Sequence, residues 1–270
     1  MARYVGIDLR PNYVRAVLVH ASYRKITVER MLEVEVAGYE TVDQAISATV
    51  VPLIQHSEAV SVAMDGEQTF LHRLRLPNTA LKQLAEVIPF ELEAQVPVDF
   101  DELVYDHRVL KRGGSGAPVI VLTAAARIEQ VSARIEQVSR VIGRPVERVA
   151  AGALSLSNLV SVCPPVAGPG PYAIVDLGGT HTELVVVADG EPVFARTLSR
   201  GVAGLPETAP ALAAELRQTA AAFALQGGAA LAAVYLVGGG ATAPGAEEYL
   251  SHELGATVTQ LPRLEVEGVG

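Results

Sequence analysis

The feature that most constrains the fold is a hairpin that occurs twice. Residues 172–187 read YAIVDLGGTHTELVVV, and residues 4–19 read YVGIDLRPNYVRAVLV. With Asp8 aligned on Asp176, both segments run without a gap through an apolar strand, Asp-Leu, a short turn and a returning apolar strand. A chain that begins each half with a copy of one hairpin is expected to form two related domains that face each other.

The turns of these hairpins predict a site for phosphate groups. A Gly-Gly-Thr turn offers a hydroxyl and backbone N–H groups that no Cβ atom obstructs, and an aspartate at a strand end can hold Mg²⁺, usually through water. The alternative for each hairpin alone is an ordinary glycine turn with a solvated carboxylate. The candidate residues of the two turns are Asp8, Asn12, Asp176, Gly178, Gly179 and Thr180.

A third glycine turn follows the predicted strand at residues 233–237. Gly238, Gly239 and Gly240 lead from this strand to a helix predicted over residues 245–254. Such a turn lets a ligand lie against the backbone, and tight packing of helix on strand is the alternative explanation.

Composition excludes several classes of protein. Half of the 270 residues are hydrophobic, which is enough for two cores of ordinary size. The net charge of −9 and the few short basic runs argue against a nucleic-acid surface. The single cysteine, Cys163, excludes an intramolecular disulfide framework. The N-terminus does not resemble a signal peptide, and no apolar run reaches the roughly 18 residues that span a bilayer.

Breaks in the pattern predict the domain organisation. We expect a first domain over residues 1–165, a second over residues 170–270, and a boundary in the proline-rich stretch at residues 164–171. A subdomain of strands and helices is expected as an insertion at about residues 64–125, lying against the first domain. Its helix, at about residues 80–95, is predicted to kink or break after Ile88 because Pro89 lacks an amide donor. A repeated Arg-Ile-Glu-Gln-Val-Ser, starting at Arg127 and Arg134, predicts a core-packing helix.

These turns, in this order and spacing, resemble the two phosphate loops and the adenosine motif of the actin-like ATPase superfamily. The insertion resembles the hallmark stretch of the PilM/GspL branch, whose members serve type IV pili and type II secretion. The resemblance implies an α/β, actin-like (ribonuclease H-like) fold in two domains. The residues that carry it are Ile88-Pro89-Phe90-Glu91-Leu92-Glu93, Val96-Pro97-Val98, Tyr105-Asp106-His107 and Phe194-Ala195-Arg196.

Two departures from the nucleotide-binding members favour GspL. The first turn is Arg10-Pro11-Asn12 where relatives usually carry small residues; proline removes a donor, and an arginine can occupy the phosphate position itself. The chain between Arg200 and Glu215 is short, which implies that a lid subdomain of the second domain is reduced. The glycine turns would then form a vestigial nucleotide cleft, with ATP and Mg²⁺ as the ligands it would take if it were still used.

A GspL-like protein implies a non-catalytic adaptor at the cytoplasmic face of the bacterial inner membrane. It would bind the N-terminal domain of the secretion ATPase and the inner-membrane platform proteins, and a homodimer is compatible with the resemblance. Because the sequence stops at Gly270 soon after a strand, we expect it to continue into a membrane segment. The alternatives are a PilM-like cytosolic ATP-binding protein that docks a membrane partner's tail, and a sugar or acetate kinase of the same superfamily, for which the chain is short and no polar substrate site stands out.

The predicted surface for a partner is an acidic segment of the insertion. A basic partner would be steered toward it, whereas the alternative is a merely solvated acidic face. Its acidic residues are Glu91, Glu93, Asp99, Asp101, Glu102 and Asp106.

Overall fold

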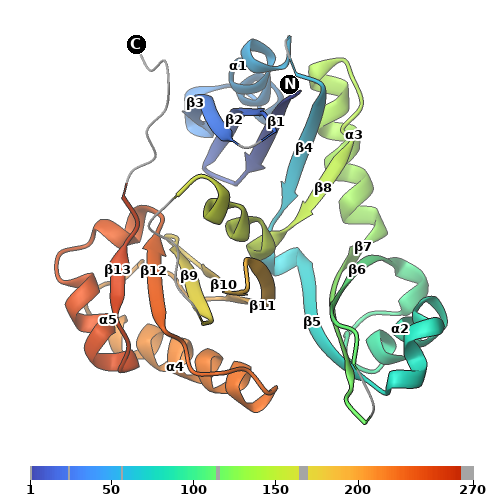
Figure 1. The fold of residues 1–270 in the computed structure, drawn as a ribbon. Coiled ribbons are helices and arrows are strands. Elements are labelled where there is room, and N and C mark those ends of the chain that lie inside the picture. Colours follow the sequence, from blue (N-terminus) through green and yellow to red (C-terminus); the bar gives the residue numbers. More distant parts are fainter. Residues whose placement is uncertain (1, 24, 56, 114–115, 164–169, 263–270) are drawn as a thin grey trace.

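The protein contains two five-stranded sheets and one three-stranded sheet (Figure 1). The structure, a computed structural model, describes residues 2–23, 25–55, 57–113, 116–163 and 170–262. The first sheet has the order β3-β2-β1-β4-β8, and its strands are β1 (Ala2–Leu9), β2 (Tyr13–Ala21), β3 (Ile26–Glu35), β4 (Ala59–Met64) and β8 (Arg148–Ala151). The second has the order β11-β10-β9-β12-β13, and its strands are β9 (Tyr172–Leu177), β10 (Thr182–Ala188), β11 (Glu191–Leu198), β12 (Ala233–Val237) and β13 (Val258–Gln260).

The two large sheets share one topology. In each, an antiparallel meander of three strands is extended by two parallel strands. The repeated hairpins also pair in equivalent registers, with Asp8 opposite Arg15 and Asp176 opposite Glu183. The repeat in the sequence therefore corresponds to a repeat in strand order.

Helices cover one face of each large sheet. On the first sheet lie α1 (Val42–Ile54), capped by the Thr41 hydroxyl, which accepts a hydrogen bond from the Gln44 N–H at 3.2 Å, and α3 (Ile128–Ile142). On the second lie α4 (Ala209–Leu225) and α5 (Ala246–Leu254). The other faces of the two sheets look toward a 3₁₀ helix, η5 (Gly152–Ser161), which runs between them (Figure 1).

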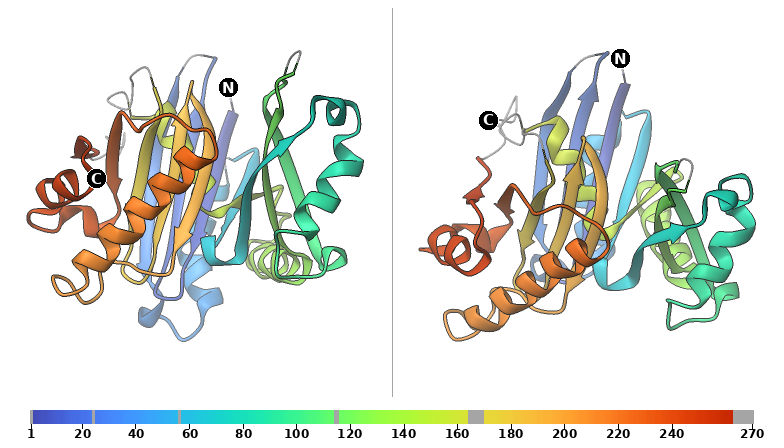
Figure 2. Two further views of the ribbon diagram at one scale, coloured as in Figure 1. Left: turned by 90° about the horizontal axis from the view of Figure 1, so that it is seen from below. Right: turned by 60° about the horizontal axis from the view of Figure 1, so that its bottom comes forward.

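The insertion forms the three-stranded sheet, in the order β5-β7-β6. Helix α2 (Leu84–Glu93) covers the side of this sheet that faces away from the second domain (Figure 2). Contacts with the second domain are made by Leu71, which packs against the cluster around η5, and by Arg73, which donates to the Gln226 carbonyl. The insertion thus touches both domains. Its strands are β5 (Thr69–Leu76), β6 (Leu103–Lys111) and β7 (Val119–Arg127).

Helix α2 differs in part from the expectation for this segment. It continues through Pro89 without the break expected as one of two outcomes after Ile88, and the residues before it, Asn78–Lys82, form a 3₁₀ turn. Pro89 has no amide hydrogen to donate to the carbonyl of Ala85, but Ala85 is exposed, so water can satisfy that carbonyl.

The predicted domain limits stay predictions. Most of the expected boundary, residues 164–169, and the last residues of the second domain, 263–270, lie outside the described residues. Among the described helices, none combines the length and the apolar character that a membrane crossing requires.

Candidate functional site

The two hairpin turns have the same backbone hydrogen bond. The Arg10 N–H donates to the Tyr13 carbonyl at 2.9 Å, and the Gly178 N–H donates to the His181 carbonyl at 3.1 Å. Arg10 therefore stands where the second hairpin has a glycine. A Cβ atom on Gly178 would lie 2.7 Å from the His181 carbonyl oxygen, so the second turn cannot take a side chain without moving.

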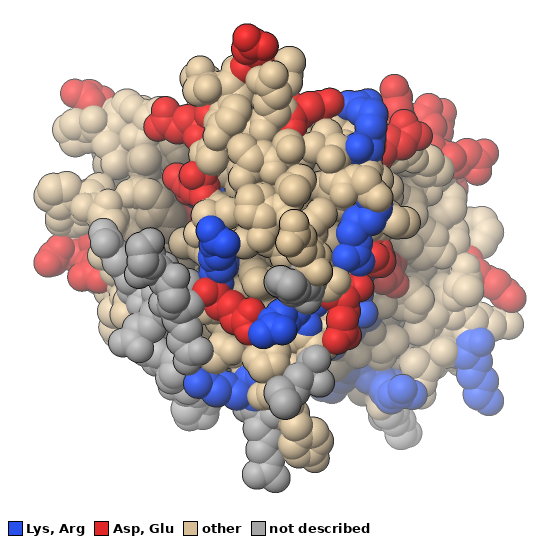
Figure 3. Space-filling model, turned by 90° about the horizontal axis from the view of Figure 1, so that it is seen from above, with Lys and Arg blue, Asp and Glu red and all other residues tan. Residues whose placement is uncertain are grey.

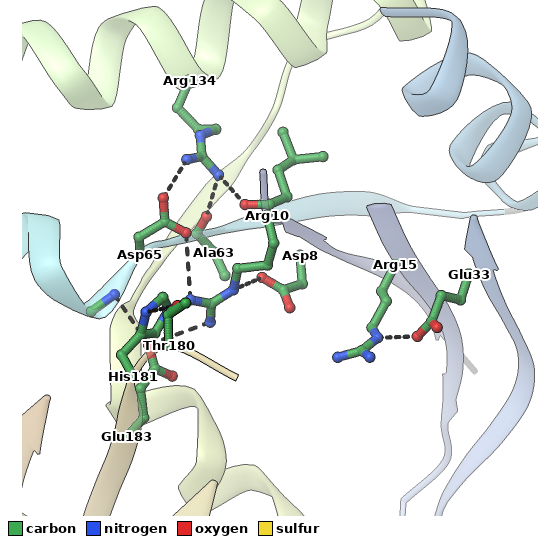
Figure 4. Close-up of polar contacts among 12 residues, drawn as sticks. Asp8, Arg10, Arg15, Glu33, Ala63, Asp65, Arg134, Thr180, His181 and Glu183 are labelled. Atoms are coloured by element: carbon green, nitrogen blue, oxygen red, sulfur yellow. Dashed lines mark hydrogen bonds and ion pairs between the residues drawn. The ribbon is translucent and has the colours of Figure 1, made fainter. Parts of the chain in front are cut away.

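The Arg10 side chain lies between the two hairpins (Figure 4). Its Nε donates to Asp8 Oδ1 at 2.9 Å, and its Nη2 donates to Glu183 Oε1 of the second domain at 3.3 Å. Its Nη1 lies 3.6 Å from Asp65 Oδ1 and 3.2 Å from His181 Nε2. Only 13% of the side chain is exposed. One guanidinium thus joins the first hairpin, the end of β4 and the second domain.

Burial and charge act in opposite directions on this cluster. Burial lowers the pKa of Arg10, but Asp8, Glu183 and Asp65 raise it by more, so the guanidinium stays charged. Burial raises the pKa of Glu183, and Arg10 opposes that rise. Burial also raises the pKa of Asp176, again against the attraction of Arg10. Arg10 thus reduces the cost of burying the charged carboxylates of Asp176 and Glu183.

A second arginine reaches the same carboxylates from helix α3. Arg134 Nη2 donates to Asp65 Oδ2 at 3.1 Å, and its Nη1 donates to the carbonyls of Ala63 at 3.2 Å and Leu9 at 3.3 Å (Figure 4). The cluster therefore holds four carboxylates, those of Asp8, Asp65, Asp176 and Glu183, against the two guanidinium groups of Arg10 and Arg134.

The Gly178-Gly179-Thr180 turn is held by the segment after β11. The N–H groups of Val202 and Ala203 donate to the carbonyls of Gly178 and Gly179 at 2.9 and 2.8 Å. Thr180 Oγ1 lies 2.9 Å from His181 Nδ1, so the hydroxyl already has a partner within the turn.

The third glycine turn packs closely on the second hairpin. A Cβ atom on Gly238 would lie 2.0 Å from Asp176 Oδ1, and one on Gly240 would lie 2.4 Å from Val202 Cγ1. These two glycines permit close packing, which is the alternative that the sequence left open. By contrast, Gly179 and Gly239 have no atom within 4 Å of an added Cβ, so the space into which a side chain would project is open at both glycines.

The predicted cleft residues fall into two groups. Asp8, Asp176 and the glycine turns come together around Arg10, whereas Asn12 is exposed at the hairpin tip, where its carbonyl accepts the Val36 N–H at 2.9 Å. Nothing in this arrangement tests nucleotide binding, so that role stays a prediction.

Sequence reasoning missed Asp65 and Arg134. Asp65 follows the end of β4 and gave only the weak signal of a polar residue after an apolar strand. The repeat gave no reason to distinguish Arg134 from Arg127. The side chain of Arg127 is 41% exposed and pairs with Glu102 at 2.6 Å, whereas that of Arg134 is 13% exposed and joins the cluster.

A separate apolar cavity of about 550 Å³ adjoins the cluster on the first sheet. Its walls include Tyr4, Val17, Ile26, Met31 and Leu159, and it meets the cluster at Asp8.

The acidic segment of the insertion lies on the surface. All six acidic residues are exposed, and three of them, Glu93, Asp99 and Glu102, share one hollow with Arg127. The face shown in Figure 3 differs, because acidic and basic side chains are interspersed there rather than separated by sign.

Comparison with known proteins decides the family. The family model described as type IV pilus assembly protein PilM matches residues 6–209. The chain belongs to this family. This membership confirms the resemblance to the PilM/GspL branch that the sequence predicted. No curated protein matched the sequence.

Solved structures confirm the predicted α/β actin-like fold. A PilM–PilN type IV pilus biogenesis complex is similar over 96% of this chain and 88% of that one, with 19% identity and a TM-score of 0.78. The cytoplasmic domain of EpsL, an inner membrane component of the type II secretion system of Vibrio cholerae, is similar over 99% and 87%, with 14% identity and a TM-score of 0.57. A protein of unknown function from Bacteroides thetaiotaomicron, with an actin-like ATPase fold, is similar over 96% and 91%, with 9% identity and a TM-score of 0.54.

Proposed function

We propose that this chain is the cytoplasmic domain of a GspL-like platform protein of type II secretion. It acts at the cytoplasmic face of the inner membrane as a non-catalytic adaptor. It recruits the secretion ATPase through that enzyme's N-terminal domain and couples it to the inner-membrane platform proteins.

The observation that carries this proposal is the position of Arg10. A phosphate group held between the two hairpins would need the space of a guanidinium that Asp8, Asp65 and Glu183 already bind. The surrounding cluster has more carboxylates than guanidinium groups, which repels a polyphosphate. ATP with Mg²⁺ therefore fits these residues poorly, and we assign no step to it.

The connection between β11 and α4 supports the same proposal. Only residues 199–208 join Leu198 to Ala209, and the N–H groups of Val202 and Ala203 within it bind the second hairpin. The connector therefore packs against the glycine turn and leaves no room for a lid subdomain at this point.

Two observations favour the alternative, a PilM-like ATP-binding protein that docks a membrane partner's N-terminal tail. The family model that matches the chain is described as that of PilM. The fold is closer to the PilM–PilN complex, with a TM-score of 0.78, than to the EpsL domain, with 0.57. Overall similarity reflects the scaffold, whereas the function depends on the site. We therefore give the position of Arg10 more weight than the family match and the TM-scores in choosing between the two functions.

Differential scanning fluorimetry with Mg-ATP distinguishes the two proposals. We expect no rise in melting temperature for the native chain at millimolar Mg-ATP. We expect a larger response from Arg10→Gly, which copies Gly178 and vacates the cleft. If the native chain gained about 2.7 kcal/mol at a hundredfold excess over a micromolar Kd, the adaptor proposal would lose to the PilM-like one.

Direct binding tests the partner. The immobilised chain would be exposed to the purified N-terminal domain of the secretion ATPase and, separately, to a peptide with the N-terminal tail of a pilus membrane partner. Binding of the ATPase domain alone supports the proposal, and binding of the tail alone contradicts it.

A further inference from the structure

The two ends of the insertion, where the chain enters and leaves it, are bound to each other and to the first hairpin. The chain leaves β4 for the insertion at Asp65, and it returns from β7 into α3, which carries Arg134. Arg134 binds the Asp65 carboxylate and the carbonyls of Ala63 and Leu9. The entry, the exit and the end of β1 therefore meet at one guanidinium.

A second set of contacts ties this base to the second domain. Arg10 faces Asp65 at 3.6 Å and Glu183 at 3.3 Å, and Glu183 Oε1 also accepts the Gly66 N–H at 3.1 Å. Glu183 is only 5% exposed. One buried carboxylate of the second domain thus binds both the first hairpin and the first residue of the insertion.

The fit around Gly66 leaves little room for adjustment. An added Cβ atom would lie 2.1 Å from Thr197 Oγ1 of β11, and one on Gly152 of η5 would lie 2.8 Å from the Gly66 Cα. Because closely packed groups move together or not at all, a shift of Glu183 or Arg10 has to move the base of the insertion.

We propose that Arg10, Asp65, Arg134 and Glu183 form a latch that couples the cleft to the insertion. In the latched state, Arg10 holds both domains and fixes the orientation of the insertion. Any anion that competes for Arg10 releases Glu183, leaves Asp65 with Arg134 alone, and loosens the insertion at its base. By reciprocity, a protein that binds the insertion and shifts it weakens the hold of the carboxylates on Arg10.

Other contacts do not replace the latch. Arg73 with Gln226 and Arg108 with Glu191 join the insertion to the second domain farther along its strands. They hold those parts of the sheet, and the latch holds its attachment to β4 and α3. Loss of the latch should therefore appear first around residues 65–72.

Amide hydrogen exchange measured by mass spectrometry tests this coupling in the full 270-residue chain. The test variant is Arg10→Met, which keeps an unbranched apolar stem and removes the guanidinium with its charge. The matched control is Arg15→Met on the same hairpin, because the described ion pair of Arg15 is with the exposed Glu33 and its guanidinium otherwise lies over the Tyr13 ring, whereas Arg10 reaches the second domain. Strand β9 serves as an internal reference for global unfolding.

The proposal predicts that Arg10→Met accelerates exchange in residues 65–72 by about tenfold or more, while β9 and the Arg15→Met control keep native rates. Faster exchange confined to residues 9–14 of the mutated hairpin would overturn it. If Arg10→Met does not fold, Glu183→Gln answers the same question, because its amide oxygen can still accept the Gly66 N–H while its pairing with Arg10 loses the charge. Native exchange at residues 65–72 in that variant would also overturn the latch.

A distance measurement adds an independent readout. Spin labels at Ala94→Cys on the insertion and Glu248→Cys on α5 report the orientation of the insertion, since both positions are exposed and Cys163 is buried. The latch predicts a single narrow distribution for the otherwise native chain and a broader or shifted one with Arg10→Met. Identical distributions would contradict it.

Discussion

At the scale of residues, one difference between two copies of a hairpin decides the chemistry of the cleft. Arg10 and Gly178 occupy equivalent places in turns with the same hydrogen bond. Gly178 leaves its turn open, whereas Arg10 places a charged group among the carboxylates of both domains. The same scaffold can therefore present a backbone cradle in one copy and an ion pair in the other.

Arg10 should contribute strongly to stability. Its removal leaves Asp8, Asp65 and Glu183 close to one another without their cation, and breaking a buried ion pair from one side costs about 3 kcal/mol. We expect Arg10→Met to lower the free energy of unfolding in urea by about that amount. Arg15→Met, which removes an exposed pair, should change it by less than about 1 kcal/mol. Equal effects of the two substitutions would contradict this account.

Asp176 should make stability depend on pH. Burial raises the pKa of Asp176 above its ordinary value of 3.8, so the unfolded chain releases this proton first. The contribution of Asp176 to stability is therefore greatest below pH 3.8 and is lost as pH rises through the folded pKa. Asp176→Asn removes this loss and should stabilise the protein at pH 7 by roughly 0.5–2 kcal/mol.

Urea denaturation of Asp176→Asn from pH 3 to 8 checks this expectation. The two proteins should have nearly equal stability at the acidic end and diverge as pH rises. A variant less stable than the native chain at pH 7 would show that hydrogen bonding to the carboxylate outweighs its burial.

At the scale of elements, the sequence predicted what depends on local pattern. The repeated hairpins and most strands and helices follow from alternation and helical spacing. The continuation of α2 through Pro89 could not be predicted, because it depends on whether water reaches the carbonyl of Ala85. Asp8 and Asp176 could be named as carboxylates of the cleft, but Asp65 was missed, and the arrangement around Arg10 depends on how the two domains pack.

Helix α3 shows why a repeat in sequence is not a repeat in environment. Arg127 and Arg134 begin identical six-residue stretches, but Arg127 is solvated and Arg134 is only 13% exposed. Arg134→Ala should remove the donor to Asp65 Oδ2 and one donor to each of two carbonyls, and cost about 2 kcal/mol. Arg127→Ala should cost less than about 1 kcal/mol. Thermal unfolding of the pair measures the contrast, and similar losses would mean that Arg134 adds little to the cluster.

At the scale of the whole molecule, two sheets of equal topology are joined at three places. The Arg10 cluster joins the hairpins, η5 packs between the sheets, and the insertion bridges to the second domain. The acidic segment lies on the insertion, over α2, β6 and the turn between them, and none of its six residues belongs to the Arg10 cluster. Its exposed carboxylates are therefore free to meet a partner without disturbing the joints.

The acidic segment should set the rate at which a basic partner binds. Exposed charges at an interface act mainly on association, and salt screens them over about 10 Å at 0.1 M ionic strength. Reversal of Asp99, Asp101 and Glu102 to lysine should therefore slow association with the secretion ATPase's N-terminal domain by about tenfold or more at low salt. It should also make association less sensitive to salt. The melting temperature should stay nearly unchanged, because all three side chains are exposed.

A second triple variant separates the effect of charge in the acidic segment from the effect of the net charge of the protein. Reversal of Glu35, Glu40 and Glu58 changes the net charge by the same amount at exposed positions of the first domain. If the acidic segment is the interface, this control should associate at close to the native rate and keep its salt dependence. Equal slowing in the two variants would show that net charge alone steers the partner. Native kinetics in both would move the interface to another face, with the exposed edge of the second domain as the next surface to test.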